Sequence, residues 1–239
     1  MMSSILRASH SGADFVLHVV QHMLTMRLYD NPAYTTFSDA VKSFEALRVV
    51  ELQKVALAFA DQLIEVYTEL ENRVNILAEK HSDDARLVWG YRSFLFMIIQ
   101  RATGIDHQMR FARLHQMLNP VYEAWQNPGL ANSTSSFGQF CDALGLGGLP
   151  DFYQANRFAE VKDWGSQQTG EAGQALQAGI KTSIDRLPLR MTKCLLAATT
   201  EKLKDGTDEY DTAVALWDPA IPAIPVSYTH LTLPTNREV

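Results

Sequence analysis

The chain has 239 residues, of which 46% are hydrophobic and 20% are charged, so it can bury a sizeable core and is not a disordered chain. Its 27 acidic residues outnumber its 21 basic residues, and the net charge of −6 argues against a dedicated nucleic-acid surface. Cys141 and Cys194 have no CxxC spacing and predict neither a zinc site nor a disulfide framework. The longest apolar runs, 55–60 and 94–99, have six residues each and are far below the roughly 20 residues that cross a bilayer. We therefore predict no membrane span and expect the chain in the cytosol or nucleus.

Apolar residues recur at three- and four-residue spacing through most of the chain, which predicts an all-α protein. The first helix is expected to begin with Asp14 as its N-cap and to stop at Asn31 and Pro32. Three further segments with an apolar face follow, beginning near Thr36 or Ser38, at 49–60 and at 63–77. The last two segments are either two helices or one bent helix.

The most apolar predicted helix covers 85–102 and has few positions left for a polar, solvent-exposed face, so it should be deeply buried. Asp83 and Asp84 precede it. Adjacent carboxylates could suggest general acid and base chemistry, but at this position capping and the helix dipole explain them better. We therefore predict a structural role for both.

Asp106 is expected to cap the next helix. Asn119 and Pro120 then predict a new helix start, with Asn as the cap and Pro in the first turn. The segment 127–129 should break that helix, and 132–136 reads as a loop. The remaining predicted helices cover 136–144, 149–158, 167–184, 187–203 and 207–217.

The predicted helix starts recur about every 20 residues, and pairing them gives a unit of about 40 residues, which is the period of HEAT and armadillo repeats. This spacing predicts a HEAT-repeat-like α-solenoid of stacked antiparallel helix pairs over 14–218. No residue signature repeats with the helices, so a compact helical bundle remains the alternative.

The two ends of the chain differ from this pattern. Residues 1–13 are expected to be disordered. The segment 219–225 has a proline at every third position and forms a Pro-rich end. Residues 226–239 have no helical period and resemble the library adaptor sequence into which open reading frames sometimes run, so we interpret them as a non-native tail.

No catalytic, cofactor-binding or metal-binding residue is predicted. His18 and His22 are four residues apart, the spacing at which two imidazoles can share a metal, but the Glu of an HExxH motif and a third ligand are missing. An exposed histidine pair is the better interpretation. The glycines of 145–148 lack a preceding strand and the Lys-Ser/Thr ending of a P-loop, so they predict a turn.

Two other local patterns have equally ordinary explanations. The segment 132–134 matches a glycosylation sequon, which we interpret as accidental because no signal peptide is predicted. The four tryptophans lie on predicted apolar faces or at helix ends, where core packing is favoured over ligand stacking. They are Trp89, Trp125, Trp164 and Trp217.

Segments that follow in order from about residue 15 to 225 resemble the central repeats of the fungal exportin-5 type of nuclear export receptor. The residues that carry the resemblance are Ser93–Ala102, Ile105, Asp106, Arg110, Arg113, Leu114, Asn119–Trp125, Phe137–Leu146, Leu187–Arg190, Thr192, Lys193 and Thr200–Lys204, with Val41, Lys42, Glu51, Leu52 and Tyr67–Glu71 upstream.

The resemblance implies an interior fragment of a large karyopherin-β protein built from HEAT repeats. Such receptors bind cargo together with Ran-GTP in the nucleus and release it in the cytoplasm after Ran hydrolyses GTP, so the chain is expected to shuttle, to need no cofactor and not to be an enzyme. The implied partners are Ran-GTP, cargo protein and nucleoporins. Some members carry double-stranded RNA, whereas the fungal type is associated with phosphorylated proteins.

No Ran-contacting residue can be transferred, because the family's N-terminal repeats have no counterpart here. The alternative is an all-α adaptor or scaffold, or a compact helical enzyme.

Overall fold

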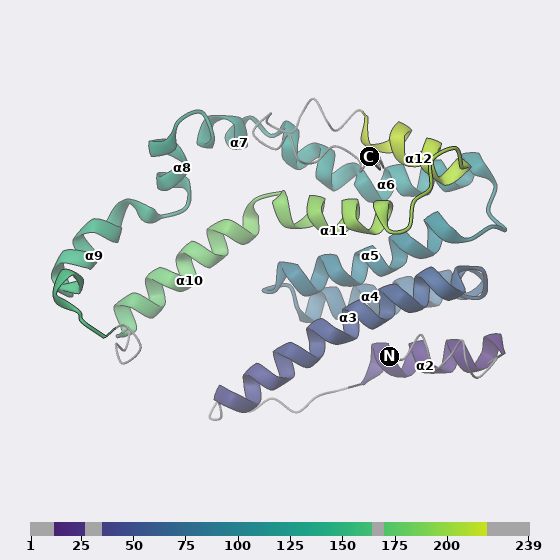
Figure 1. The fold of residues 1–239 in the computed structure, drawn as a ribbon, viewed down its shortest axis with the longest axis horizontal. Helices are drawn as coiled ribbons and strands as arrows, with labels where there is room; N and C mark the ends of the chain where they lie inside the picture. The colour runs from purple at the N-terminus through teal and green to yellow at the C-terminus, as the bar shows by residue number, and fades with distance from the viewer. Residues whose placement is uncertain (1–11, 27–34, 164–169, 219–239) are drawn as a thin grey trace, which may run out of the picture. The chain divides into compact units, whose positions relative to one another are not determined.

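The computed structural model describes residues 12–26, 35–163 and 170–218, and within these ranges all regular structure is helical (Figure 1). The all-α prediction is therefore confirmed. Contacts along the chain define two units: Met1–Val121 with Leu189–Val239 form unit 1, and Tyr122–Pro188 form unit 2. The predicted end segments 1–13, 219–225 and 226–239 lie almost wholly outside the described residues.

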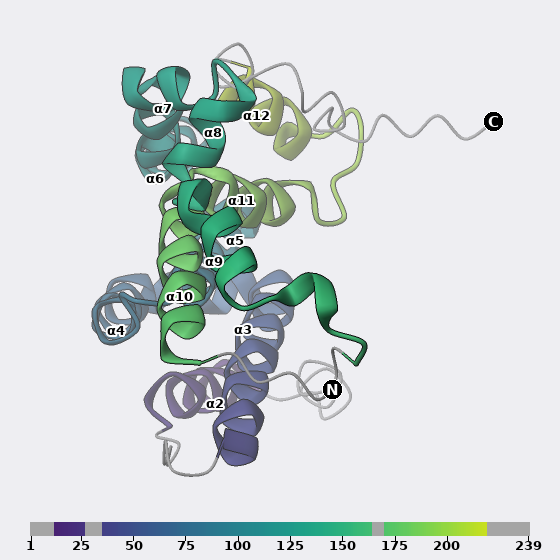
Figure 2. The same ribbon diagram turned by 90° about the vertical axis from the view of Figure 1, so that its left-hand side faces the viewer.

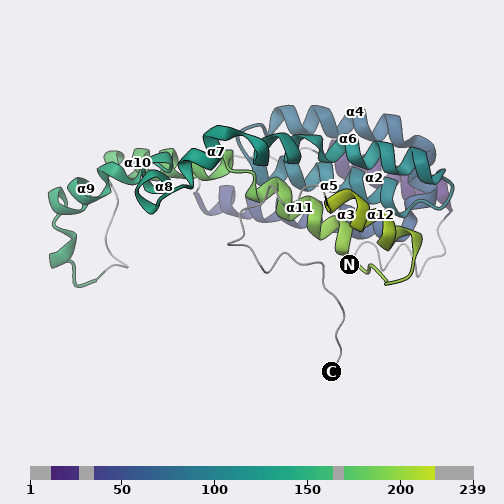
Figure 3. The ribbon, with the colours of Figure 1, turned by 90° about the horizontal axis from the view of Figure 1, so that it is seen from above.

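Unit 1 consists of stacked helices. Its elements are α2 (Ala13–Thr25), α3 (Thr35–Leu63), the 3₁₀ turn η1 (Ile64–Val66), α4 (Tyr67–Lys80), α5 (Ala85–Arg101), most of α6 (His107–Gln126), α11 (Leu189–Thr200) and α12 (Asp208–Trp217). In Figures 2 and 3, α3, α5 and α11 form one layer, and α4 and α6 lie on one side of it. Helix α5 packs most extensively against α3 and α11, and α2 packs against both α3 and α4. This stacking of successive helices agrees with the predicted α-solenoid.

Helix α5 forms the centre of unit 1, as its sequence predicts. Eleven of its 17 residues are buried, including Tyr91, Phe94 and Ile98, none of which is exposed. Gly90 lets α3 come close, because a Cβ at this position would lie 2.5 Å from Val49 Cγ1. A helix that is apolar nearly all round needs neighbours on several sides, and α3, α4 and α11 provide them.

Several helix boundaries differ from the predictions. The first helix is capped by Gly12, and Asp14 lies inside its first turn, where its charge favours the helix N-terminus. This helix ends at Thr25, whereas the predicted stop at Asn31 and Pro32 lies outside the described residues. The segments predicted from Thr36 and at 49–60 form one helix, α3, which is kinked at Phe59. The turn η1 then separates α3 from α4, so the segments 49–60 and 63–77 belong to two helices.

The predicted break at Asn119 and Pro120 is wrong, because α6 continues through Pro120 to Gln126. Proline in a helix interior removes one backbone hydrogen bond and crowds the preceding turn. A single apolar stripe that runs past the proline offsets this cost. The stripe consists of the buried residues Leu114, Leu118, Val121, Tyr122 and Trp125.

The C-terminal helices of unit 1 join the core through buried polar groups. The Gln100 side chain of α5 donates to the Thr199 carbonyl of α11 at 3.0 Å. Trp217 Nε1 of α12 donates to Thr199 Oγ1, also at 3.0 Å. Because these groups are all buried, each hydrogen bond replaces one that water would otherwise make. They fix α11 and α12 against α5.

Unit 2 contains three short helices, two 3₁₀ turns and one longer helix among its described residues. They are α7 (Pro128–Ser133), α8 (Phe137–Ala143), the 3₁₀ turn η2 (Leu146–Gly148), α9 (Leu149–Ala155), the 3₁₀ turn η3 (Phe158–Glu160) and α10 (Glu171–Arg186). The sequence missed α7, whose N-cap is Asn127: its side chain accepts from the Gly129 N–H at 2.8 Å. The ring of Phe158 makes edge contacts with Phe152 and Tyr153 at centroid distances of 5.6 and 5.7 Å.

Candidate functional site

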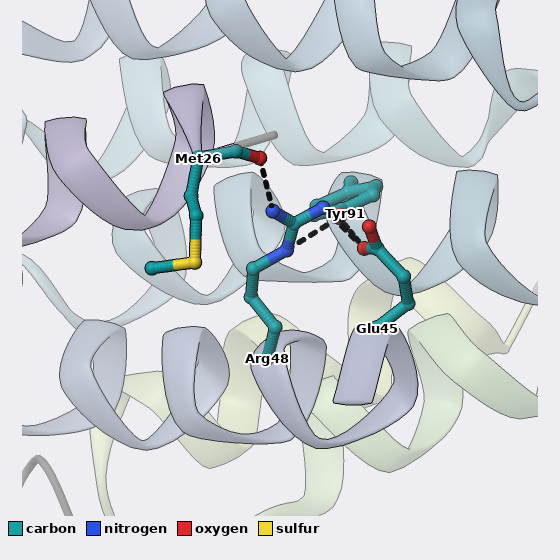
Figure 4. Close-up of polar contacts among 4 residues, drawn as sticks. All are labelled: Met26, Glu45, Arg48 and Tyr91. Atoms are coloured by element: carbon teal, nitrogen blue, oxygen red, sulfur yellow. Dashed lines mark hydrogen bonds and ion pairs between the residues drawn. The ribbon is translucent and has the colours of Figure 1, made fainter. Parts of the chain in front are cut away.

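A buried polar cluster joins three helices of unit 1. Figure 4 shows the guanidinium of Arg48, on α3, between the carboxylate of Glu45 and the backbone carbonyl of Met26, which follows α2. Arg48 Nη1 donates to Met26 O at 2.9 Å, and Arg48 Nε and Nη2 donate to the Tyr91 hydroxyl at 3.1 and 2.7 Å. Arg48 Nη2 also pairs with Glu45 Oε2. The Tyr91 hydroxyl, from α5, donates to the same carboxylate oxygen at 3.0 Å.

All three side chains of the Glu45–Arg48–Tyr91 cluster are buried. Glu45 and Arg48 are 7% and 4% exposed, and Tyr91 is not exposed at all. Burial raises the pKa of Tyr91 to about 12. The nearby charges contribute less, because Arg48 lowers this pKa whereas Glu45 raises it. The phenol therefore stays protonated at neutral pH and keeps donating to Glu45.

The chemistry of the cluster is structural. A base or acid that works near neutral pH needs access to a substrate and a pKa close to that pH, whereas here a neutral phenol and a buried ion pair satisfy one another. A buried ion pair contributes little net stability but becomes costly when one partner is lost. The cluster therefore specifies how α2, α3 and α5 fit together.

Sequence reasoning missed this cluster. Glu45 and Arg48 are three residues apart, and both lie on the α3 face that also carries the buried residues Val49 and Leu52. A charged pair in the middle of an apolar helix face is the signal that could have found it, because charged residues are almost never buried unless they are paired.

The described residues of unit 1 line hollows, of which two bear on the site. One, of about 290 Å³, lies between α3 and the turn joining α4 to α5, and Lys42, Glu45, His81 and Asp83 are among its lining residues. His81 Nε2 is buried there without a hydrogen-bond partner. The other, of about 430 Å³, lies between α4 and α6 and is lined by Tyr67, Thr68, Glu71, Arg113, Gln116 and Met117. The Tyr67 hydroxyl contacts Met117 Sδ at 3.9 Å, and burial raises the pKa of Tyr67.

The predicted carboxylate pair is confirmed as a capping feature for Asp84. Its Oδ1 accepts from the backbone N–H of Arg86 at 2.9 Å and of Leu87 at 3.3 Å, so it caps α5. Asp106 caps α6 in the same way. Asp83 is exposed.

The histidine pair, the glycine turn and the sequon that the sequence analysis singled out lie on separate elements. His18 and His22 are both exposed on α2. Gly145, with φ of +74°, and the 3₁₀ turn η2 form the predicted turn at 145–148. Asn132 and Ser133 belong to the short helix α7 and Thr134 follows it, so the predicted loop is partly helical.

The tryptophans and cysteines occupy ordinary packing positions. Trp125 and Trp217 are buried, at 7% and 2% exposure. Trp89 is half-buried under the Arg92 guanidinium, 4.7 Å from the ring centroid. Trp164 lies outside the described residues. Cys141 and Cys194 are half-buried free thiols, and burial raises the pKa of Cys194.

Within the described ranges, no three His, Cys, Asp or Glu side chains are placed to hold a metal ion. No helix in the same ranges combines the length and the apolar character that a membrane crossing requires.

Comparison with known proteins gives the decisive observation. The chain is 24% identical over 190 residues to Protein MSN5 of Saccharomyces cerevisiae, a match that covers 79% of the chain. The chain is thus distantly similar to MSN5. The resemblance to the exportin-5 type of karyopherin is thereby confirmed. The match covers only 15% of the length of MSN5. No family model matches the chain, and no solved structure matches it.

Proposed function

We propose that this chain is an interior segment of a nuclear export receptor, in which residues 14–218 supply HEAT-like helical repeats. The observation that carries this proposal is the similarity to MSN5 over 190 residues. The stacked helices of unit 1 support it, because receptors made of repeats need segments whose helices pack mainly on their neighbours. The 219–225 segment then marks the end of the repeats, and 226–239 is a tail foreign to the receptor.

The proposed role is mechanical and non-enzymatic. When each helix pair contacts mainly its neighbours, small rotations at successive interfaces add up to a change in the curvature of the array. Binding of one partner can then change the affinity for another through shape. GTP hydrolysis is the task of Ran, so this chain needs neither catalytic residues nor a cofactor.

The proposed partners are Ran-GTP, a cargo protein and nucleoporins, and they bind the whole receptor. The receptor is proposed to move between nucleus and cytoplasm. Structured RNA is a further class of cargo for some members of the exportin-5 type of receptor, which this chain resembles. The net charge of −6 favours a protein cargo here, because RNA binding depends on neutralising phosphates with basic residues.

A chimera tests the proposal. The segment of MSN5 that matches this chain is replaced by the chain's own residues, and the chimera is expressed in yeast cells that lack MSN5. The chimera should restore the nucleocytoplasmic distribution of an MSN5-dependent reporter. Phe94→Asp, which places a charge in the core of α5, should abolish the rescue.

Two results would count against the export function. If an unrelated helical-repeat segment of equal length restored the reporter distribution equally well, the chain would act only as a spacer. A chimera that is abundant and folded but inactive would favour an adaptor or scaffold. The chain alone should give only background capture of Ran loaded with a non-hydrolysable GTP analogue, since it is placed inside the array.

A further inference from the structure

Helices α5 and α11 carry positive charges and no negative ones. The 17 residues of α5 include three arginines, and the 12 residues of α11 include Arg190 and Lys193, but neither helix contains an Asp or a Glu. The whole chain, by contrast, has a net charge of −6. The two helices pack side by side in unit 1 (Figure 1). They therefore form a basic strip on an acidic protein.

The two helices begin at the same end of unit 1. The last residues of α5 donate hydrogen bonds to carbonyls at or just beyond the end of α11, Gln100 to Thr199 and Arg101 to Glu201. Figure 1 shows both helices running in the same direction. Their first turns are therefore neighbours, although they are about 100 residues apart in the sequence.

Three exposed cations, Arg86 of α5 and Arg190 and Lys193 of α11, lie near this shared beginning. Burial raises the pKa of the Cys194 thiol, and the charges of all three cations oppose this rise. A common effect on one sulfur atom places the three charges around it. Arg86 and Lys193 have no ion-pair partner among the described residues. We call these three side chains the basic patch.

Two residues of the basic patch occupy positions that are unfavourable for their helices. Arg86 is the second residue of α5 and Arg190 is the second residue of α11, and neither helix has an acidic residue in its first turn. The helix dipole favours Asp or Glu at this end and disfavours cations. Helix α12, which begins with Asp208 and Glu209, shows the favoured arrangement. Side chains that break a local stability rule are expected at functional sites.

We infer that the basic patch docks an acidic segment of a partner protein, in which several Asp or Glu side chains follow one another. Arg190 and Lys193 are about 4.5 Å apart along the axis of α11, and Arg86 lies on the neighbouring helix. This spread over two helices suits successive carboxylates better than one small ion. The arginines can each hold a carboxylate through two parallel N–H groups.

The surroundings favour a short acidic segment over a nucleic acid. Asp83 and Asp84 precede α5, and Asp84 is engaged as its cap. Helix α4, which packs on α5, carries Glu69, Glu71 and Glu79. A long phosphate backbone would pass near these carboxylates as well, whereas a short segment needs only the basic patch. The inference does not depend on export, so peptide docking and rescue by the chimera can fail separately.

Peptide binding tests the inference. A fluorescent peptide of about twelve residues that alternates Glu and Ser is titrated with the chain, and fluorescence anisotropy reports binding. The same peptide with Gln in place of Glu is the control and should not bind. The affinity for the glutamate peptide should fall at least about fivefold between about 50 mM and about 300 mM NaCl, because the patch is exposed and salt screens it.

Charge reversal locates the binding. The double variant Arg86→Glu/Lys193→Glu should bind the glutamate peptide about tenfold more weakly or worse, and it should bind the matching lysine peptide instead. Its Tm should not fall, because Lys193 is exposed and a glutamate in the first turn of α5 suits the helix dipole. Lost binding at an unchanged Tm separates a docking role from a structural one.

A matched control reverses an exposed cation elsewhere in unit 1. Arg73→Glu on α4 should keep the affinity for the glutamate peptide within about twofold. An equal loss in this control would reduce the binding to general charge attraction and overturn the inference. So would failure of the unaltered chain to bind the glutamate peptide, or equal binding by the double variant. Tighter binding of a single- or double-stranded RNA of about 20 nucleotides, lost in the double variant, would assign the patch to nucleic acid instead.

Discussion

Helices α5 and α10 have nearly the same length but very different environments. Eleven of the 17 residues of α5 are buried, whereas Gly173 is the one buried residue among the 16 of α10. Both helices carry apolar residues at helical spacing. In α10, however, the stripe consists of Leu176, Ile180 and Ile184, and the remaining positions are mostly Ala, Gly, Gln and charged residues. Periodicity thus predicts that a helix forms, while the number of apolar faces decides how deeply it is buried.

The same difference separates the two units as wholes. Unit 1 contains nearly all fully buried large side chains of the described residues, and its helices are tied by internal polar contacts. In unit 2, Phe137, Leu149, Tyr153 and Ile184 are each at least 42% exposed. We therefore expect the free energy of unfolding to depend on unit 1 and to be insensitive to most changes in unit 2.

The largest effect should come from the core of α5. Phe94→Ala removes a fully buried ring and should lower the free energy of unfolding by about 3 to 5 kcal/mol. Ile180→Ala, which changes a half-buried side chain of α10, should cost below about 1 kcal/mol. Urea unfolding followed by circular dichroism measures both. Equal losses would contradict the contrast between the two units.

The next effect concerns charge pairs. Arg48→Met leaves Glu45 buried without its cation and should cost about 3 kcal/mol. Lys181→Met in α10 removes a pair with Asp185 in which the Lys side chain is 64% exposed, and it should cost about 0.5 kcal/mol at most. The double variant Glu45→Leu/Arg48→Met should recover part of the loss, because no unpaired charge remains. A cost for Arg48→Met as small as that for Lys181→Met would mean that the cluster is not a buried structural contact.

Helix existence and local caps could be predicted from sequence because they depend on neighbouring residues. Asp84 and Asp106 were identified as caps from the apolar runs that follow them, and both hold the expected backbone N–H groups. The predicted break at Pro120 failed for a non-local reason: the buried stripe of α6 continues past the proline, and its burial outweighs the lost hydrogen bond.

The charged pair Glu45 and Arg48 on the apolar face of α3 is a local signal for the candidate site, but its partners on other helices were beyond local reasoning. Arg48 bonds Met26, 22 residues away, and Tyr91, 43 residues away, so its partners become neighbours only when α2, α3 and α5 pack. Patterns of residue type along one helix do not contain that information. The division into two units was likewise not predicted, because α10 and α5 have the same period and differ in what surrounds them.

Alkaline pH should weaken unit 1 through Tyr91. Its pKa is raised to about 12 by burial, above the ordinary value near 10. A neutral phenol with a raised folded-state pKa contributes stability that is fully present below pH 10 and is lost as pH rises towards 12. The free energy of unfolding should therefore fall by roughly 2 kcal/mol over this window, since each pKa unit corresponds to about 1.4 kcal/mol. In urea titrations at successive pH values, Tyr91→Phe should show a shallower decline, and an unchanged slope would exclude this tyrosine as the cause.

The smallest predicted difference compares two helix caps. Asp84→Ala removes the acceptor for the Arg86 and Leu87 N–H groups of α5 and should lower the free energy of global unfolding by about 1 kcal/mol. Asn127→Ala removes the corresponding cap of α7 in unit 2. Because α7 contributes no buried residue, its fraying should speed amide exchange at Gly129 without moving the urea midpoint. Asp83→Ala, which alters an exposed carboxylate beside Asp84, is the matched control and should change neither observable. An equal shift in the urea midpoint for Asn127→Ala and Asp84→Ala would show that the two units unfold as one cooperative structure. The contrast between α5 and α10 would then describe burial but not stability.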